Sequence, residues 1–182
     1  MLYVQQSLAP DEELIHMGEF HWWYNVQAAM GIVWGVFICG LILGMAVYIQ
    51  KNLGISLSSY RISPDASTLD YIRALHPGIK LIAFLMFLMG LLRFAQMMVA
   101  KATTEIAITT SRLIYKRGLV ARAVGEISID RIEGVNVVQG IIGRIFDFGR
   151  IVIRGMGVGE MVLPPIERPV VFRKAIEKAR TS

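Results

Sequence analysis

The sequence predicts a membrane protein with a transmembrane α-helical hairpin, followed by a small antiparallel β-barrel or sandwich that a C-terminal α-helix caps. Residues 26–49 are twenty-four residues without a charge, and a second apolar stretch runs from about residue 79 to residue 100. After Lys101 the apolar period changes from helical to alternating, and a last amphipathic segment begins at Pro169. The predicted parts are a leader (1–24), a hairpin (25–100) and a β domain (101–182).

Composition supports this division. Of the 182 residues, 54% are hydrophobic and 18% are charged, whereas soluble domains have about 25% charged residues. Residues 1–24 contain four acids and no Lys or Arg, and residues 101–182 contain fourteen basic and eight acidic residues. A basic domain beside a bilayer suits anionic headgroups, although a solvated basic surface is the alternative. The only cysteine, Cys39, lies in the first span, which excludes a disulfide framework and a Cys-based metal site.

The two apolar segments are predicted to span a bilayer, because a helix of about 20 apolar residues crosses its core. The spans are placed at about residues 25–49 and 79–100, with a polar connector at 50–78. An acidic leader and a long apolar run argue against a cleaved signal peptide. In the leader, Pro10 followed by acids favours a helix start. The aromatic residues at 22–24 are expected at one membrane interface, and Lys51 at the other.

The connector contains one helix signal. Ser67 followed by Asp70 at the third position favours the start of a short helix that ends before His76-Pro77. Its apolar side is expected to hold Leu69, Ile72 and Leu75.

The spans contain polar and small residues with two interpretations each. Arg93 and Gln96 share one helix face, and an intramembrane charge marks a functional position unless its side chain reaches the nearer headgroups. The first span has two pairs of glycines, each four residues apart and on opposite faces. One face is expected to hold the second span and the other a neighbouring subunit, unless the glycines reflect ordinary enrichment in membrane helices. The glycines are Gly31, Gly35, Gly40 and Gly44.

The β domain is predicted from short alternating segments separated by turns. Strands are expected at residues 105–109, 112–116, 119–124, 126–130, 133–138, 150–154 and 160–163, with a break at 140–144. Pro169 is suited to the first turn of a helix, whose apolar stripe is Phe172, Ala175, Ile176 and Ala179. The residues expected in the core are Ile106, Ile108, Leu113, Tyr115, Ile151, Ile153 and Phe172.

This chain resembles the bacterial pleckstrin-homology (PH) domain of small membrane proteins over nearly its whole length. The matching elements are Thr104-Glu105, Thr109 with Arg112, Gly118-Leu119, Ile127 to Ile132, Gly143-Arg144, Gly149, and Ile166 with Pro169 to Phe172. The acidic leader and the paired spans are similar as well. The resemblance implies a PH-like fold behind two transmembrane helices, and it implies little about chemistry.

The resemblance also bears on lipid binding. Members of the wider superfamily that bind phosphoinositides use a long, lysine-rich loop between the first two strands. Here that connection is expected at residues 109–111, which is too short to surround an inositol phosphate. A diffuse contact with anionic headgroups is left to four basic residues, namely Arg112, Lys116, Arg117 and Arg122.

No motif indicates catalysis. The glycine-rich run at 155–159 is followed by a strand, so it is expected to be a hairpin turn and not a phosphate loop. His16, Glu19 and His21 do not form a metal-binding pattern, and no serine or cysteine has the setting of a nucleophile. The prediction is therefore a protein that is not an enzyme, with no cofactor, no metal, no small-molecule substrate and no nucleic acid.

The function predicted from the sequence is a non-catalytic, membrane-tethered interaction module that binds membrane lipids and either itself, as a homo-oligomer, or another membrane protein. The alternatives are binding of anionic lipid headgroups through the basic domain, and a role as accessory subunit of a transporter or protease with Arg93 facing its core. Two spans place both termini on one side. Basic residues flank the spans four against four, so the cytoplasmic side of the inner membrane is implied by the resemblance alone.

Overall fold

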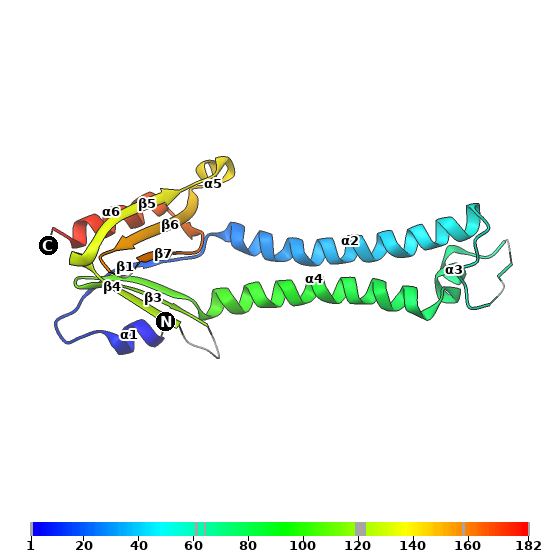
Figure 1. Ribbon diagram of the computed structural model, residues 1–182, viewed down its shortest axis with the longest axis horizontal. Helices are drawn as coiled ribbons and strands as arrows, with labels where there is room; N and C mark the ends of the chain where they lie inside the picture. The colour runs from blue at the N-terminus through cyan, green and yellow to red at the C-terminus, as the bar shows by residue number, and fades with distance from the viewer. Residues whose placement is uncertain (1, 61, 64, 119–122, 158, 182) are drawn as a thin grey trace. The chain divides into compact units, whose positions relative to one another are not determined.

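The computed structural model describes residues 2–60, 62–63, 65–118, 123–157 and 159–181 (Figure 1). The helices are α1 Leu2–Ser7, α2 Trp22–Asn52, α3 Thr68–Ala74, α4 Pro77–Thr103, α5 Ile141–Ile145 and α6 Pro169–Ala179. The strands are β1 Leu14–Gly18, β2 Glu105–Thr109, β3 Arg112–Arg117, β4 Ala123–Ser128, β5 Ile132–Val138, β6 Phe148–Gly155, β7 Gly159–Val162 and β8 Ile166–Glu167, and a 3-10 turn, η1, covers Ile129–Arg131.

The chain divides into two compact units. The helical unit is residues 26–97 and contains most of α2 and α4. The β unit combines residues 1–25 with residues 98–182 and contains all the strands named above. Each unit is described below by itself.

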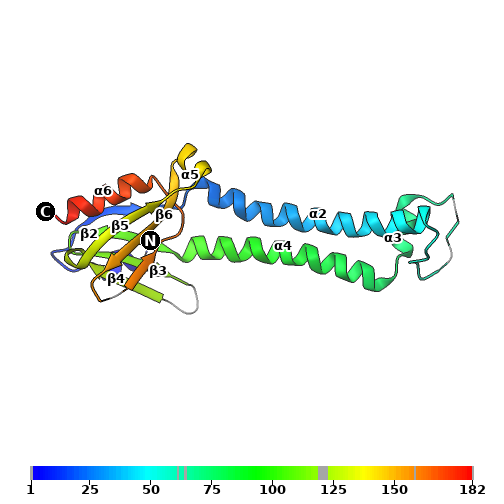
Figure 2. The same ribbon diagram turned by 45° about the horizontal axis from the view of Figure 1, so that its top comes forward.

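The β unit consists of two antiparallel sheets (Figure 2). The first has the order β1-β2-β3-β4, and the second has the order β5-β6-β7 with β8 also paired to β6. A backbone bridge between Phe20 and Ile166 joins the sheets at one corner. No ladder joins β4 to β7 among the described residues, so the sandwich expectation is confirmed and a closed barrel is wrong.

The first strand comes from the segment expected to be a separate leader. β1 pairs with β2, with His16 opposite Ile108. The expected helix start at Pro10 is wrong, because Pro10 and Asp11 form a turn and α1 ends before them. The two long helices therefore lie in the connection between the first and second strands of the β unit, at residues 19–104.

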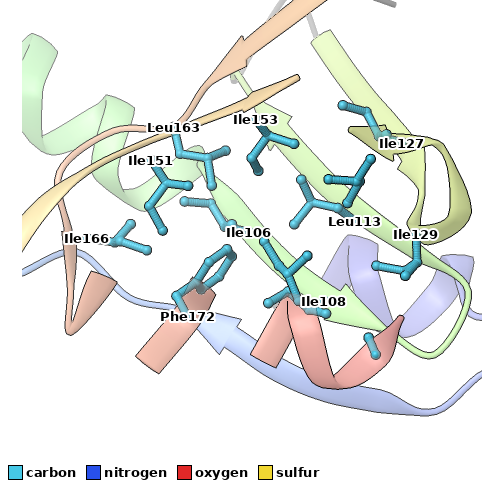
Figure 3. Packing of buried hydrophobic residues seen from close by; sticks show 13 residues of the cluster. Ile106, Ile108, Leu113, Ile127, Ile129, Ile151, Ile153, Leu163, Ile166 and Phe172 are labelled. Atoms are coloured by element: carbon cyan, nitrogen blue, oxygen red, sulfur yellow. The ribbon is translucent and has the colours of Figure 1, made fainter. Parts of the chain in front are cut away.

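The core of the β unit lies between the sheets (Figure 3). The expected core is confirmed, although Tyr115 packs against the cluster only partly buried. The alternation of each strand explains why these residues are buried, because successive side chains point to opposite faces of a sheet. The fully buried members of the expected core are Ile106, Ile108, Leu113, Ile151, Ile153 and Phe172.

Helix α6 closes this core as expected. Pro169 occupies the first helical position, and the preceding Arg168 adopts a left-handed backbone with φ of 47°. Phe172, Ile176 and Ala179 are buried, and the helix contacts strands of both sheets.

The remaining strands follow the expectations with two exceptions, and one of them is β8, which was not expected. The other is β4, which runs through residues 123–128 across the boundary expected between the strands at 119–124 and 126–130, and η1 follows it. Residues 119–122 lie outside the described residues. The glycine-rich run forms the β6–β7 hairpin, with Gly155 paired to Gly159, so the hairpin expectation is confirmed. The expected break at 140–144 contains the short helix α5.

In the helical unit, α2 and α4 are each long and apolar enough to cross a membrane. They have 31 and 27 residues, and their most apolar windows have mean hydropathies of 2.4 and 2.0. Only 17% and 6% of those windows is buried inside the structure. Both helices therefore leave most of their apolar side chains exposed.

The connector folds onto one end of α2. The expected helix is α3, where the Ser67 hydroxyl accepts from the Asp70 N–H at 3.3 Å and the Asp70 carboxylate accepts from the Ser67 N–H at 3.2 Å. Leu75 is buried as expected, but Leu69 is 64% exposed and Tyr71 takes the buried position instead. The residues buried in this cluster are Ala46, Val47, Tyr71 and Leu75.

Candidate functional site

A groove of about 410 Å³ lies where β4 and β7 form the ends of their sheets, and we call it the open seam. Within the described part of the chain, β4 pairs only with β3 and β7 only with β6. The open seam is lined by Tyr115, Arg117, Ala123, Val124, Gly125, Glu160, Met161 and Val162.

The β4 edge directs backbone hydrogen-bonding groups outward. The N–H of Ile129 donates to the carbonyl of Ser111 at 3.0 Å, so these two residues form a hydrogen-bonded pair. In an antiparallel ladder such pairs alternate with pairs that exchange no hydrogen bonds. Val124 and Glu126 occupy the alternate positions of β4. Their N–H and C=O groups therefore point to the free edge.

The β7 edge has the same property. The N–H of Leu163 donates to the carbonyl of Ile151 at 2.8 Å, which places Glu160 and Val162 at the alternate positions. Within the described residues, backbone donors and acceptors without a ladder partner thus flank the open seam on both sides, and such edges are templates for pairing with another extended chain.

The side chain of Met161 partly fills the space between the two edges. A Cβ on Gly125 would lie 2.6 Å from the Met161 Cε atom. Met161 also packs against the core of the β unit, so its side chain forms the inner wall of the open seam.

Arg112, a candidate for anionic contact, is held in an internal network. Its guanidinium donates to both carboxylate oxygens of Glu12, at 3.0 Å and 2.8 Å, and to Glu126 at 3.0 Å. The hydroxyls of Thr109 and Ser111 also donate to Glu12, at 2.5 Å and 2.7 Å. The network joins the N-terminal segment to the first sheet.

The electrostatics of Glu12 follow from this network. Burial raises the pKa of the carboxyl, but the hydrogen bonds from Thr109, from the Ala9 N–H, and from Ser111 and Arg112 outweigh it and lower the pKa from 4.5 to about 2. The carboxylate is ionised at neutral pH and neutralises Arg112, whose own pKa is raised, chiefly by its hydrogen bond to Glu12.

Lys116, the second candidate, is also paired. Its ammonium lies 2.9 Å from a carboxylate oxygen of Glu105, and the two side chains are 14% and 9% exposed. Glu105 also accepts from the N–H of Val4 in α1 at 3.2 Å. Burial raises the pKa of Glu105, but the hydrogen bond from Lys116 and the other contacts lower it to about 2.

The structure does not bring the three described basic candidates together as one exposed surface. Arg112 and Lys116 neutralise buried carboxylates, whereas Arg117 is exposed and lines the open seam. Arg122 lies outside the described residues.

The expected interfacial aromatics contact the segment around α5. His21 is 5% exposed and stacks on Phe148 with ring centroids 5.0 Å apart. Trp23 stacks on Phe146 at 5.8 Å, and Trp22 meets Phe146 edge-on at 5.5 Å. The last turn of α4 contacts the first turn of α2, since the Lys101 ammonium donates to the Asn25 side-chain oxygen at 2.8 Å.

The four glycines of the first span differ in their surroundings. Gly31 and Gly35 lie against Gly90 of α4, and a Cβ on Gly90 would lie 2.5 Å from the carbonyl oxygen of Gly31. Among the described residues, no atom lies within 4 Å of a Cβ placed on Gly40 or Gly44. Gly90, the residue closest to the contact, was not among the residues singled out from the sequence, because it has no glycine partner four residues away in its own helix.

The structure places the other candidate positions in separate units. Arg93 and Gln96 are both exposed in the helical unit. The ring of His16 lies 5.7 Å from that of Phe172. No group of three or more metal-ligating side chains occurs among the residues that the structure describes.

Comparison with protein families assigns the chain. The family model for the bacterial PH domain matches residues 25–180. The chain belongs to the bacterial PH domain family. No curated protein matches, and no solved structure matches. The matched residues include both long helices and begin after β1, and the family is consistent with a non-catalytic module.

The strand order of this bacterial PH domain corrects the expectation about its first loop. Residues 109–111 connect the second and third strands and not the first and second. The first connection is the whole segment that carries α2 and α4. The length of the turn at 109–111 therefore says nothing about lipid binding. The ion pairs of Arg112 and Lys116 do argue against it, because these two cations are already neutralised by carboxylates.

The outward-facing residues of the open seam were not identified from the sequence. Val124 lies next to a segment expected to end one strand and begin another, so its ladder partner could not be assigned. The signal that was available is the alternation of Glu126, Ile127 and Ser128, which places Val124 on the same strand face as Glu126.

Proposed function

We propose that this bacterial PH domain protein is a membrane-anchored, non-catalytic interaction module that binds an extended polypeptide segment in the open seam. The observation that carries the proposal is that β4 and β7 border one groove with edges that no other described strand pairs. An added strand gains main-chain hydrogen bonds from such an edge, and the neighbouring side chains give it specificity.

The exposed apolar side chains of α2 and α4 support the membrane anchor. Phe37 and Leu41 of α2 and Leu81 and Met89 of α4 are each at least half exposed, and large apolar surfaces of this kind mark contact with a membrane or a partner. Helices of 31 and 27 residues exceed the roughly 20 residues that cross a bilayer. We place both termini in the cytoplasm, at the inner membrane.

The chemistry of the open seam favours a peptide over a lipid headgroup. Val124 and Val162 are 39% and 50% exposed and give the groove apolar surface. Arg117 adds a positive charge, and Glu160 adds a carboxylate that accepts from Arg154 at 2.7 Å. Two other basic residues of β3 are neutralised by carboxylates. The partner segment belongs to a second copy of the chain or to another membrane protein.

Val124→Pro tests the peptide contact in the full-length protein in native membranes. Proline removes the outward N–H of an edge strand and leaves the β3–β4 ladder intact, and Val124→Thr is the matched control that keeps the N–H. A photo-crosslinking amino acid at Val162 should capture a partner, and Val124→Pro should lower the yield with an unchanged melting temperature. Intact mass identifies a second copy or a different protein.

The same experiment can contradict the proposal. Equal capture by Val124→Pro and Val124→Thr, or equal capture from Val162 and from the exposed Val170 of α6, would show that the seam is not the contact. Raising the salt concentration should leave capture unchanged, whereas contacts between exposed charges are screened over about 8 Å at physiological ionic strength.

The topology has a separate test. Reporter fusions after residue 182 and within the connector at Ser59 should give cytoplasmic and exported signals, respectively. An exported signal from residue 182 would contradict the cytoplasmic placement.

A further inference from the structure

Helix α5 exposes an apolar surface that the β unit does not cover. Ile141 is 84% exposed and Ile145 is 71% exposed, and Ile142 and Phe146 are 49% and 43% exposed. Contiguous apolar residues at the surface mark a site of contact with a membrane or a partner. We call these four residues the α5 tip.

The base of the α5 tip is fixed to the β unit. The side-chain amide of Gln139 donates to the carbonyls of Gly143 and Phe148, at 3.3 Å and 3.1 Å. Gly143 is buried, and a Cβ there would lie 2.5 Å from the carbonyl oxygen of Phe148. The small residue faces inward against β6, so the large residues of the same turn are left outside.

Aromatic contacts connect the tip to the first turn of α2. Phe146 meets Trp22 edge-on at 5.5 Å and stacks on Trp23 at 5.8 Å with an interplanar angle of 12°. Trp23 also stacks on Phe148 at 6.0 Å. The tip is therefore held beside the start of α2 by side chains that all belong to the β unit.

The start of α2 is also the start of its uncharged segment. Trp23 lies within this segment, because residues 20–50 contain no Asp, Glu, Lys or Arg. Tryptophan favours the headgroup level of a bilayer, where its ring is half buried and its N–H stays wet. Trp22 is 50% exposed, which is compatible with that level.

From this continuity we infer that the α5 tip inserts into the boundary between lipid headgroups and acyl chains, as a second and shallow membrane contact of the β unit. The inference rests on the proposed membrane anchor. Apolar residues with a basic neighbour are typical of segments that lie in this boundary, and Arg144 of the same turn is exposed. The contact would fix the orientation of the β unit at the membrane and, with it, the orientation of the open seam.

The test uses the full chain in vesicles of neutral and anionic phospholipid. A thiol-reactive environment-sensitive fluorophore is attached to Cys39 in the wild type, and to Ile145→Cys or Met156→Cys in a Cys39→Ser background. Met156 is the matched control, because it is 56% exposed and follows the far end of β6 from Phe148. Quenching is measured with nitroxide lipids labelled at a shallow or a deep acyl position.

We expect the fluorophore at Ile145 to lose intensity to the shallow nitroxide and the one at Met156 to lose none. Equal quenching at the two positions would overturn the inference. Disulfide-linked dimers of Ile145→Cys without lipid quenching would also overturn it, because a second copy would then cover the tip. The fluorophore at Cys39 reports on the anchor alone: deep quenching there with none at Ile145 rejects only the α5 tip, and no quenching at Cys39 rejects the proposed anchor.

Discussion

The β unit and the helical unit use the same apolar residue types in opposite ways. In the β unit Ile151 and Ile153 are fully buried between the sheets, whereas in the helical unit Phe37 is 56% exposed and Leu41 is 50% exposed. Alternation along a strand separates an inner face from an outer one, and α2 has no such separation. The comparison teaches that burial stabilises the first unit and that the second depends on close helix contact and on its surroundings.

The largest expected effect is on burial in the β unit. Phe172→Ala should lower the free energy of unfolding of the β unit by about 3–5 kcal/mol, because it removes a fully buried aromatic ring and leaves a cavity. Domains of this size have total stabilities of about 5–15 kcal/mol. Chemical unfolding of the full-length protein in detergent measures the change.

Val170→Ala is the control for Phe172→Ala on the same helix. Val170 is 47% exposed, so its truncation should change the free energy of unfolding by less than about 0.5 kcal/mol. If the two variants unfold alike, α6 does not seal the core. A fragment that begins at residue 101 is unsuitable for this test, because it lacks β1.

The sequence predicted the β unit best where partners are close along the chain. β2, β3 and their hairpin follow from alternation and a turn, and α6 follows from Pro169 and its stripe of apolar residues. β1 was missed because its partner, β2, begins about 90 residues later. β1 itself has only five residues. It follows a proline and several acids, and so short a segment gives no strand signal of its own. A contact of this sequence separation is not encoded locally.

The second prediction concerns the buried charge that holds β1 in place. Glu12→Gln should lower the free energy of unfolding at neutral pH by about 2 kcal/mol, since hydrogen bonds to charged groups contribute about 1.5–3 kcal/mol. The neighbouring Glu13 is exposed, so Glu13→Gln is the matched control and should have no measurable effect. Hydrogen exchange of the β1 amides provides a local readout.

The same carboxyl groups predict the pH dependence. Because folding lowers the pKa of Glu12 and of Glu105 from 4.5 to about 2, their contribution to stability is complete above about pH 4.5 and is lost as the pH falls toward 2. Glu12→Gln should therefore flatten the acid dependence. An equally steep loss in the wild type and in Glu12→Gln would contradict the role assigned to this carboxylate.

The candidate site was predicted less well than the fold. Arg112 and Lys116 were identified as exposed cations because a sequence shows a charge and not its partner. Glu12, the partner of Arg112, lies in a segment that was expected to be separate. The seam depends on which strand ends a sheet, and that follows from topology rather than from any one residue.

The third prediction concerns close contact in the helical unit. Gly90→Ala should force α2 and α4 apart, because the new Cβ would lie 2.5 Å from the Gly31 carbonyl oxygen and 2.9 Å from the Gly35 Cα. Overpacking of this kind typically costs about 1–3 kcal/mol. Gly40→Ala is the control, since nothing lies within 4 Å of its Cβ position.

Spin labels at the exposed positions Val33 and Leu92, in a Cys39→Ser background, measure the separation of the two helices by electron paramagnetic resonance. Gly90→Ala should lengthen the distance and Gly40→Ala should not. If neither variant changes it, the glycine contact does not set the helix spacing, and if Gly40→Ala alone lowers the oligomer mass, its face contacts a neighbouring subunit.

The smallest expected effect separates two glycines with nearly equal clearances. A Cβ on Gly125 of β4 would lie 2.6 Å from the Met161 Cε atom, about as close as the Cβ of Gly90 would lie to the Gly31 backbone. The neighbour decides the outcome, because a methionine side chain has three rotatable bonds and moves aside, whereas two helix backbones move only together.

Alanine also restricts the unfolded chain more than glycine does, which favours the folded state by about 0.4–1 kcal/mol where the backbone is compatible. The φ angle of Gly125 is not positive, so the backbone there is compatible with alanine. Gly125→Ala should therefore leave the free energy of unfolding within about 1 kcal/mol of the wild type, measured by chemical unfolding in parallel with Gly90→Ala. A loss at Gly125 equal to that at Gly90 would show that Met161 is held rigidly, so that the open seam is a packed contact and not an adaptable one.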